Sequence, residues 1–299
     1  MRKYDNHSYL LSVILLLSFL APTPAILFAK LYRKKVLLNY HSGEADDHLT
    51  RWPVTAIPII RLADEIAVPS EYLVQVFAQA WSSGAGDLQH YRQETFRFRE
   101  RRPLKPVFLS NRNLESHYGV DRVLRAFAII QQSLPEASLT VAGDGSQRRA
   151  LNGLTSDLNL RQVEFSGQID QDKVLAQYDA ADIYLNGSEI DNQPLSLLEA
   201  FACGLPVVTT NAGGIPDIVT HERTGLMVRC GDYKALAREA IRLLNDVPLA
   251  DHITTQALAE CQKYSWPAVR PQWQELYEEL AAVKQKAEGS RQKAVGRRQ

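Results

Sequence analysis

The sequence is poor in cysteine and has no excess charge of either sign. Only 3 cysteines occur in 299 residues (Cys203, Cys230 and Cys261), and no two of them form a CxxC pair. This scarcity excludes a disulfide framework and a cysteine-based zinc site, and it favours a reducing compartment. Because 34 Lys and Arg residues balance 34 Asp and Glu residues, the net charge is zero. We therefore expect no nucleic-acid partner.

The sequence also lacks an apolar run long enough to cross a bilayer, which takes about 20 residues. The stretch "YLLSVILLLSFLAPTPA" follows Arg2 and Lys3 and is broken by Pro22 and Pro24. A short basic region before an apolar run is typical of a secretory signal or a membrane anchor. A buried strand followed by a helix from about Pro24 is the alternative, which the strand-like "VLLNYHSG" favours. The predicted location is accordingly cytoplasmic, or in peripheral contact with a membrane through residues 9–21.

A regular alternation of short apolar runs with helical segments begins near Lys105. The predicted strands are residues 106–111, 138–143, 163–167, 182–188, 206–210 and 225–231. Near-continuous apolar strands that alternate with helices indicate a parallel sheet covered on both faces. The sequence therefore predicts an α/β fold with a complete Rossmann-like doubly wound domain here. Three helical segments follow.

The first hundred residues are less regular. They contain a strand–helix–strand pattern ending in "VLLNYHSG", and "RLADEIAVPSEYLVQVFAQ" then predicts a strand flanked by helices. In residues 80–104 neither the strand period nor the helix period persists. Five arginines lie within residues 92–102. They suit either a solvated linker between domains or a basic patch that faces phosphate.

Two acids flank the start of the helix that follows the fourth predicted strand. Asp191 lies in the loop, and Glu199 lies inside the apolar run "LSLLEAFACGLPVV". In doubly wound sheets, ligands bind beyond the carboxyl ends of the strands, at helix N-termini. There Glu199 could accept two ribose hydroxyls and Asp191 sugar hydroxyls, while the amides of Leu195 and Ser196 could bind a pyrophosphate. Glu189 in the same loop could replace Asp191.

Each of these acids also has a plain structural interpretation. An acid near a helix N-terminus stabilises the helix dipole, and a helical Glu can simply be exposed. The wholly apolar or small neighbours of Glu199 argue against mere solvation. The pair Asp170 and Asp172 opens a helix, where Asp is a common cap, and "EADD" at 44–47 reads as a capped turn. We therefore predict no metal site.

Several motifs, in order, carry a resemblance to a known family. "SEIDNQPLSLLEAFACGLPVV" is followed by "GGIPDIV" and "TGLMVRCGD". These resemble the nucleotide-binding half of GT-B glycosyltransferases of the family 4 type (group 1), the retaining, glycogen-synthase-like enzymes. The likeness covers about residues 107–244. "LTVAGDGSQRRAL" resembles the family's strand–loop–helix, and "VEFSGQID" its base-binding turn.

The resemblance implies a role for each matching residue. "SNR" at 110–112 stands in place of the family's glycine–arginine pair, so Arg112 would neutralise the diphosphate. Asp191 takes the place of the first acid of the paired-glutamate motif and would contact the donor sugar. Leu195 and Ser196 would offer backbone amides to the phosphates, and Glu199 would grip the ribose.

Two further residues enter through the same resemblance. Gly167 would let the base approach the backbone closely. His41, at the end of "VLLNYH", is similar to the family's strand-ending histidine and would face the transferred sugar; the alternative is a structural or surface histidine. Two departures stand out. Asp191 is one methylene shorter than the usual Glu, and His117 and Tyr118 lie where the family has a phosphate-binding lysine.

For the whole chain, the resemblance implies a metal-independent, retaining glycosyltransferase without a cofactor. Its substrate would be a UDP- or GDP-linked sugar, and its acceptor a glycan, a lipid or a small molecule. A nucleotide-sugar-binding protein without turnover and a sugar-nucleotide epimerase of the same fold are the alternatives. The family's opening strand and glycine-rich loop have no counterpart here, so the first domain is predicted to be truncated.

The predicted domain limits follow from these patterns. Residues 1–103 form a partial, acceptor-side Rossmann-like domain with its linker, and residues 104–265 form the nucleotide-sugar-binding domain. Residues 266–287 form a helix that crosses back to the first domain. Residues 288–299 form a disordered basic tail.

Overall fold

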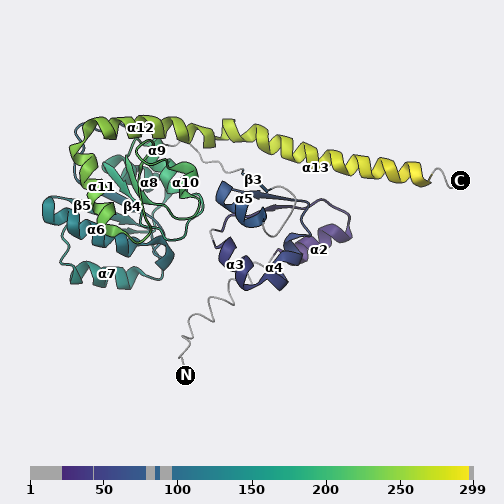
Figure 1. Cartoon of the computed structure of the whole chain (residues 1–299), viewed down its shortest axis with the longest axis horizontal. Coiled ribbons are helices and arrows are strands. Elements are labelled where there is room, and N and C mark those ends of the chain that lie inside the picture. Colours follow the sequence, from purple (N-terminus) through teal and green to yellow (C-terminus); the bar gives the residue numbers. More distant parts are fainter. Residues whose placement is uncertain (1–21, 43, 79–84, 88–95, 296–299) are drawn as a thin grey trace, which may run out of the picture. The chain divides into compact units, whose positions relative to one another are not determined.

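The chain divides into two compact units. The structure is a computed structural model, and it describes residues 22–42, 44–78, 85–87 and 96–295. One unit, here the N-terminal unit, combines Met1–Gln89 with Val269–Gln299, and the other, the sheet unit, is His90–Ala268 (Figure 1).

The sheet unit is built on 6 parallel strands in the order β6-β5-β4-β7-β8-β9. The strands are β4 (Val107–Asn111), β5 (Ser138–Ala142), β6 (Val163–Gly167), β7 (Ile183–Leu185), β8 (Val207–Thr210) and β9 (Leu226–Val228). This is the doubly wound order, in which the direction of winding reverses between β4 and β7. Each strand lies within one of the runs predicted from the sequence, so the predicted α/β fold is confirmed.

Helices cover both faces of this sheet (Figure 1). They are α6 (Val120–Ser133), α7 (Arg148–Asp157), α8 (Gln171–Ala180), α9 (Leu195–Ala202), α10 (Ile215–Ile218), α11 (Tyr233–Asn245) and α12 (Val247–Cys261), with short 3-10 helices η2 (Ser116–Tyr118) and η3 (Gln262–Tyr264). Asp232 and Asp246 cap α11 and α12, each accepting a backbone N–H from the first turn.

Side chains point alternately to the two faces of the sheet, and each face carries its own hydrophobic core. Phe108 on β4 pairs with Ile183 on β7, and both lie in a cluster with α6 and α11. The next pair, Leu109 and Tyr184, points to the other face and packs with α9. Successive residues of a strand face opposite ways, so these apolar runs bury both faces.

The N-terminal unit contains a smaller parallel sheet of 3 strands in the order β1-β2-β3. The strands are β1 (Leu37–Asn39), β2 (Glu65–Val68) and β3 (Ala85–Asp87), and the helices are α2 (Thr23–Leu31), α3 (Ala45–Arg51), α4 (Pro53–Ile60) and α5 (Glu71–Ala78). β1 and β2 lie in the predicted strand segments. β3 was not predicted, because no alternation marks its residues.

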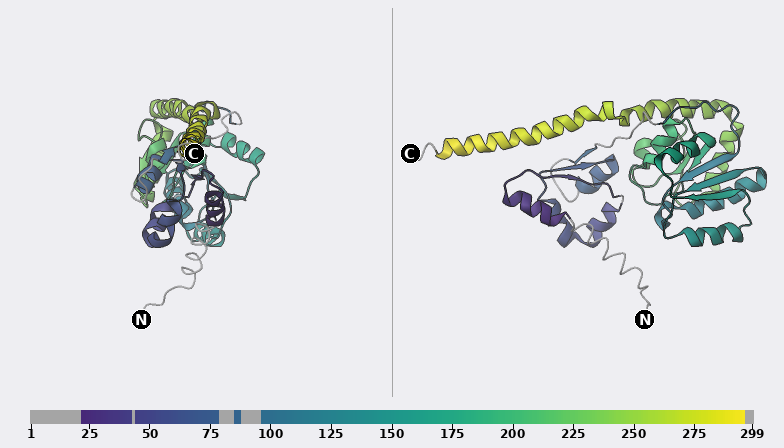
Figure 2. Two further views of the ribbon diagram at one scale, coloured as in Figure 1. Left: turned by 90° about the vertical axis from the view of Figure 1, so that its right-hand side faces the viewer. Right: turned by 180° about the vertical axis from the view of Figure 1, so that it is seen from behind.

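Most of helix α13 (Trp266–Val295), drawn in yellow in Figure 2, belongs to the N-terminal unit. Its Val269 packs with Ala67 of β2. The sequence placed the end of this helix at 287 and a disordered tail at 288–299. The helix instead continues to Val295. Ala, Gln, Lys and Arg are strong helix formers, and they dominate this segment. Residues 296–299 lie outside the described residues.

Three of the arginines between 92 and 102 are engaged inside the sheet unit. Arg101 is buried and donates to the carbonyl oxygens of Tyr178 (2.9 Å) and Ala181 (2.8 Å). Arg99 pairs with Asp182 at 3.1 Å and Arg102 with an aspartate of α12 at 2.9 Å. These side chains attach the connecting segment to the sheet unit, and the burial of Arg101 means that the interpretation of a solvated linker is wrong for that residue.

The predicted location also needs correction. We expected a cytoplasmic chain, or one in contact with a membrane through residues 9–21. Within the described residues, none of the helices has the length and apolar character needed to cross a membrane. α2, which follows the apolar stretch, has only 9 residues. Residues 9–21 themselves lie outside the described residues.

Candidate functional site

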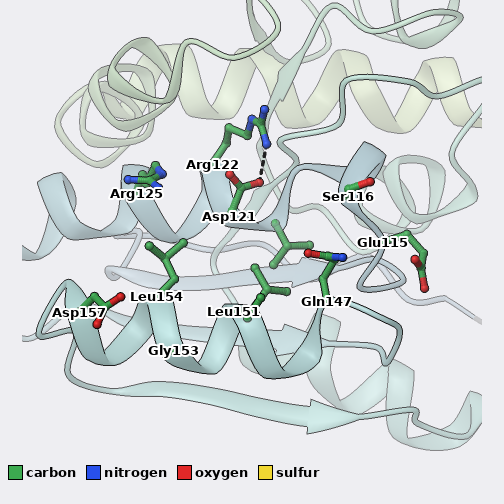
Figure 3. A pocket seen from close by; sticks show the side chains of 12 residues that line it. Glu115, Ser116, Asp121, Arg122, Arg125, Gln147, Leu151, Gly153, Leu154 and Asp157 are labelled. Atoms are coloured by element: carbon green, nitrogen blue, oxygen red, sulfur yellow. Dashed lines mark hydrogen bonds and ion pairs between the residues drawn. The ribbon is translucent and has the colours of Figure 1, made fainter. Parts of the chain in front are cut away.

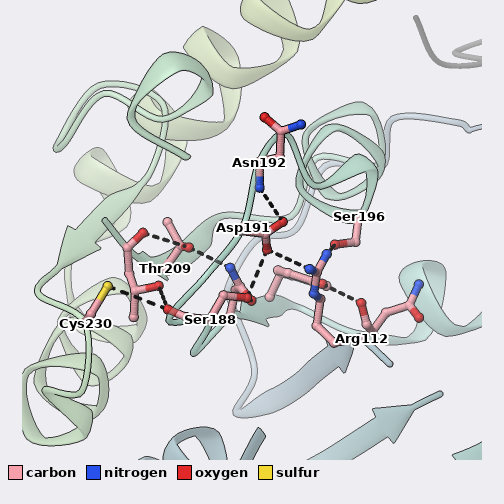
Figure 4. Close-up of polar contacts among 11 residues, drawn as sticks. Arg112, Ser188, Asp191, Asn192, Ser196, Thr209 and Cys230 are labelled. Atoms are coloured by element: carbon pink, nitrogen blue, oxygen red, sulfur yellow. Dashed lines mark hydrogen bonds and ion pairs between the residues drawn. The ribbon is translucent and has the colours of Figure 1, made fainter. Parts of the chain in front are cut away.

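The predicted donor-binding residues gather at the point where the winding of the sheet reverses. β4 and β7 are neighbours there, and ligands of doubly wound folds bind beyond the carboxyl ends of such strands. Arg112 directly follows β4, and Asp191 lies in the loop after β7. Their side chains form an ion pair, with Nη2 2.6 Å from Oδ2 (Figure 4). Nη1 of Arg112 also donates to Oγ of Ser196 at 3.3 Å.

Asp191 is buried and is held by hydrogen bonds within its own loop and by neighbouring loops. Its side chain is only 7% exposed. Oδ2 accepts a hydrogen bond from Oγ of Ser188 at 3.0 Å, and Oδ1 accepts one from the amide of Asn192 at 3.0 Å (Figure 4). A Cβ atom on Gly213 would lie 1.9 Å from the Asp191 carbonyl oxygen, and Gly213 has a φ of +48°. Only glycine allows this approach at low cost, so the loop position is fixed.

The guanidinium of Arg112 packs against an aromatic ring. Its guanidinium carbon lies 4.1 Å from the ring centroid of Tyr118, a cation–π contact. Tyr118 lies in the region where the resemblance places a lysine, and here its aromatic ring contacts Arg112. Nε of Arg112 is buried and has no hydrogen-bond partner among the described residues.

Further contacts join the loop after β4 to the loop after β7. The carbonyl oxygen of His117 accepts the amide of Glu189 at 2.8 Å, and Arg122 forms an ion pair with Glu189. A Cβ atom on Gly119 would lie 1.9 Å from the Gly187 carbonyl oxygen. The two loops thus pack backbone to backbone. Glu189 is engaged by Arg122, which leaves Asp191 as the loop acid that meets Arg112.

The N-terminus of α9 offers donors for an anion. The helix begins after Pro194, and no side chain caps it. The amides of Leu195 and Ser196 lie in the first turn, where no intrahelical acceptor exists and the helix dipole is positive. Ser196 is buried, whereas the Leu195 side chain is 41% exposed. Together with the guanidinium of Arg112, these first-turn amides gather hydrogen-bond donors of the kind that bind phosphate.

Glu199 lies one turn further along α9 and is half-buried. Its Oε2 accepts a hydrogen bond from the hydroxyl of Tyr178 at 2.7 Å. Burial raises the pKa of the Glu199 carboxyl, while the hydrogen bond from Tyr178 and the charge of Arg112 act in the opposite direction. A carboxylate in this setting can accept hydrogen bonds from hydroxyl groups.

A cavity of about 690 Å³ opens at the carboxyl ends of β4, β5 and β6. Its lining consists of Asn111, Asn113, Glu115, Gly143, Asp144, Gly145, Gln168, Ile169 and Val174. Gly167 ends β6 directly before this lining, with a φ of +71° and open space around the position of a Cβ atom. The volume lies in the range of small-molecule sites, about 300–1,000 Å³.

A second cavity, of about 420 Å³, lies between α6 and α7 (Figure 3). Its wall carries an ion pair between Asp121 and Arg122 at 2.7 Å. The apolar side chains of Leu151 and Leu154 form part of its lining. None of the residues predicted for the donor site lines it.

His41 belongs to the N-terminal unit. It follows β1 and lines a cavity of about 330 Å³, with apolar walls that include Ile26 and Leu38. Burial lowers the pKa of His41, and the same cause lowers the pKa of His48 in this cavity. The structure thus brings together Arg112, Asp191 and Ser196 around the start of α9, and it places His41 in the other unit.

The acidic groups considered for metal binding are used locally. Asp170 occupies the N-cap position of α8 without a side-chain cap hydrogen bond, and it pairs with Lys173 at 4.0 Å. Asp47 of the "EADD" segment pairs with Arg51 along α3 at 2.8 Å. Within the part of the chain that the structure describes, no group of 3 or more His, Cys, Asp or Glu side chains is placed to hold a metal ion.

Two residues of this site were not among those predicted from the sequence. Tyr178 hydrogen-bonds to Glu199, and Tyr118 lies beneath Arg112. A buried tyrosine needs a partner for its hydroxyl, which is the one signal that "LAQYDAADIYL" offered. Tyr118 was noted only as a departure from the family pattern.

A match to a family profile assigns the chain to a known protein family. The profile of the family described as "Glycosyl transferases group 1" matches residues 92–259. The chain belongs to this family. Among curated proteins, it is similar to sulfoquinovosyl transferase SQD2 of Arabidopsis thaliana, with 28% identity over 267 residues. That match covers 82% of this chain and 52% of the relative, so the chain spans about half the length of that relative.

Solved structures agree on the GT-B fold. Sucrose-phosphate synthase from Thermosynechococcus elongatus superposes with a TM-score of 0.77 at 24% identity, covering 89% of this chain and 72% of that one. HepE from Anabaena, in complex with UDP-glucose, superposes with a TM-score of 0.74 at 20% identity, covering 85% of this chain and 75% of that one. At these identities the likeness shows the fold alone.

Proposed function

We propose that this chain is a glycosyltransferase that takes its sugar from a nucleotide-diphosphate donor bound in the sheet unit. One observation carries the proposal. Arg112 is held between Asp191 and Ser196 at the uncapped start of α9, at the reversal point of the sheet. A guanidinium beside first-turn amides is suited to a diphosphate, and an adjacent carboxylate is suited to sugar hydroxyls.

The same geometry fits the chemistry of transfer. When the bond to the sugar breaks, negative charge develops on the leaving diphosphate. In this proposal Arg112 and the amides of Leu195 and Ser196 stabilise that charge. This supports a mechanism in which protein groups supply the positive charge. It is tested by measuring transfer after treatment with EDTA, which should leave the rate unchanged.

Neighbouring residues are proposed to bind the remaining parts of the donor. In this proposal Glu199 accepts the ribose hydroxyls, and Asp191 contacts the sugar. The base lies in the cavity beside Gly167. Uridine is the first candidate because HepE of the same fold holds UDP-glucose, and guanosine is the second.

We further propose that transfer retains the configuration of the sugar, as family 4 resemblance implies. The anomeric configuration of the product, read by proton NMR, tests this directly. His41 is proposed to face the transferred sugar. An acceptor hydroxyl on a glycan, a lipid or a small molecule would complete the reaction.

A thermal-shift titration of the full chain with UDP, GDP and their sugar conjugates tests donor binding. A ligand at about 100 times its dissociation constant should stabilise the chain by roughly 2.7 kcal/mol. Glu199→Ala should abolish this shift, while Glu136→Ala, which removes an exposed acid of the same unit, should keep it. An equal shift in Glu199→Ala, or no shift with any nucleotide in the wild type, would overturn the proposal.

A further inference from the structure

A partly buried chain of hydrogen bonds leads from β4 to Glu199. Nδ2 of Asn111 donates to the hydroxyl oxygen of Tyr178 at 3.2 Å, and that hydroxyl lies 2.7 Å from Oε2 of Glu199. A tyrosine hydroxyl has a single proton. Because the Asn111 amide donates to the oxygen, and the carboxylate is the nearest acceptor, the proton points at Glu199. The carbonyl oxygen of Ser196 is a more distant acceptor, at 3.2 Å.

The ring of Tyr178 is fixed by the core. It is fully buried, stacks on Tyr184 with centroids 6.0 Å apart, and meets the edge of Phe96 at 5.9 Å. A ring packed in this way has little rotamer freedom. The hydroxyl of Tyr178 is therefore a fixed point against which the Glu199 carboxylate is set.

The hydrogen bond from Tyr178 fixes the orientation of the Glu199 carboxylate. Oε2 is occupied by the Tyr178 hydroxyl, and no hydrogen bond from the described residues reaches Oε1. A carboxylate has about four acceptor positions, so the remaining ones stay available in one fixed orientation. Two vicinal hydroxyls of a ribose need such a preset acceptor, because a carboxylate that rotates freely loses entropy on binding.

We propose that Tyr178 is a positioning residue, which orients Glu199 so that the donor site recognises ribose and discriminates against 2′-deoxyribose. This inference rests on the proposed function, since it assumes that Glu199 binds the nucleoside. Tyr178 itself touches the carboxylate and acts through it. Its hydroxyl is too deeply buried to contact a ligand directly.

The chain offers a matched control. Tyr184 is equally buried and stacks on Tyr178, but its hydroxyl donates to the backbone carbonyl of Asn111 at 3.0 Å. Tyr178→Phe and Tyr184→Phe thus each remove one buried hydroxyl from the same stack. Only the first deprives Glu199 of its partner. Thermal melts without ligand report any loss of stability separately.

The experiment is a calorimetric titration of the full chain and both variants with UDP and with 2′-deoxy-UDP. If GDP rather than UDP stabilises the chain, GDP and 2′-deoxy-GDP replace them. A hydrogen bond to a charged group corresponds to roughly tenfold to a hundredfold in affinity, so the wild type should prefer the ribonucleotide by about that factor. Tyr178→Phe should bring this preference to within about threefold of unity, whereas Tyr184→Phe should keep it.

A pH profile gives a second readout that a merely structural role would not change. The groups that face Glu199 are Arg112 from the loop after β4, Tyr178 from α8, Tyr184 from β7 and Cys203 at the end of α9. The Tyr178 hydrogen bond lowers the pKa of the carboxyl, so removing it raises that pKa. As pH falls from 7, UDP binding should therefore weaken at a higher pH in Tyr178→Phe than in the wild type.

The outcomes separate the two proposals. If the wild type binds UDP and Tyr178→Phe retains the full preference for ribose, the positioning role is overturned and the donor site stands. If Tyr184→Phe loses the preference equally, the effect belongs to the stack and the inference is again overturned. If the wild type binds no nucleoside diphosphate, the proposed function fails, and this inference fails with it.

Discussion

The two predicted parts of the site differ in how they are built. In the sheet unit, Arg112 and Asp191 are each held by several polar contacts and by glycines that permit close backbone approach. In the N-terminal unit, His41 lines a largely apolar cavity. The first arrangement presents fixed charge to a ligand, and the second presents a neutral imidazole of lowered pKa. We infer that donor binding depends on the sheet unit, and that His41 serves the transfer step.

The largest expected effect follows from removing the central cation. Arg112→Ala should lower the free energy of unfolding by about 3–5 kcal/mol, because Asp191 is left buried without its partner. Arg242→Ala is the control, since its pair with Glu222 is exposed to solvent and should contribute far less than the buried pair. Urea denaturation of both variants measures the difference. Equal losses would show that the Arg112 cluster is no more than a surface contact.

The next effect separates the two parts. His41→Ala should lower the rate of sugar transfer by about a hundredfold, the scale of one positioned catalytic side chain. The affinity for UDP should stay within about twofold of the wild type, because His41 lies outside the sheet unit. Steady-state kinetics and a parallel UDP titration give both quantities. A loss of UDP affinity as large as the loss of rate would break the division of roles.

A smaller effect tests the rigidity of the Asp191 loop. Gly213→Ala should cost about 1–3 kcal/mol of stability, since the residue has a positive φ and a Cβ atom would clash with the Asp191 carbonyl. Gly153→Ala should instead stabilise the chain by about 0.5–1 kcal/mol, because Gly153 lies in α7 with open space around it. Thermal unfolding measures both. A neutral Gly213→Ala would mean that the loop adjusts freely.

The sequence was most informative where burial imposes a pattern. The runs that became β4 to β9 are apolar on both faces, so their number and their parallel arrangement were readable. Glu199 could be predicted as a site residue because a charged side chain within an apolar helix is rarely there only to be solvated. Arg112 followed only from the family resemblance. The contact between Arg112 and Asp191 could not be foreseen, because it joins loops 79 residues apart in the sequence.

Other features could not be predicted from the sequence pattern. Tyr178 reads as one more apolar position of a helix, and its hydroxyl gains meaning only when α8 packs against α9. β3 has three residues, two of them Ala and Gly, so it shows no strand pattern. Its place is set by pairing with β2, which is a tertiary effect.

The smallest effect concerns pH. The pKa of Glu199 in the folded chain lies above its ordinary value, mainly through burial. The folded state therefore loses stability as pH rises through that raised pKa, and below the ordinary value this loss is absent. Glu199→Gln does not titrate, so its stability relative to the wild type should increase between pH 4 and pH 8. Melts at a series of pH values test the sign, and a relative decrease would contradict it.

Hydrogen exchange with and without UDP tests the central claim most directly, because it locates the bound nucleotide on the chain. The account predicts protection at the amides around Arg112 and at the segment from Ser188 to Glu199, and none of this protection in Glu199→Ala. Protection confined to the cavity between α6 and α7, or to the surroundings of His41, would contradict a donor site at the start of α9.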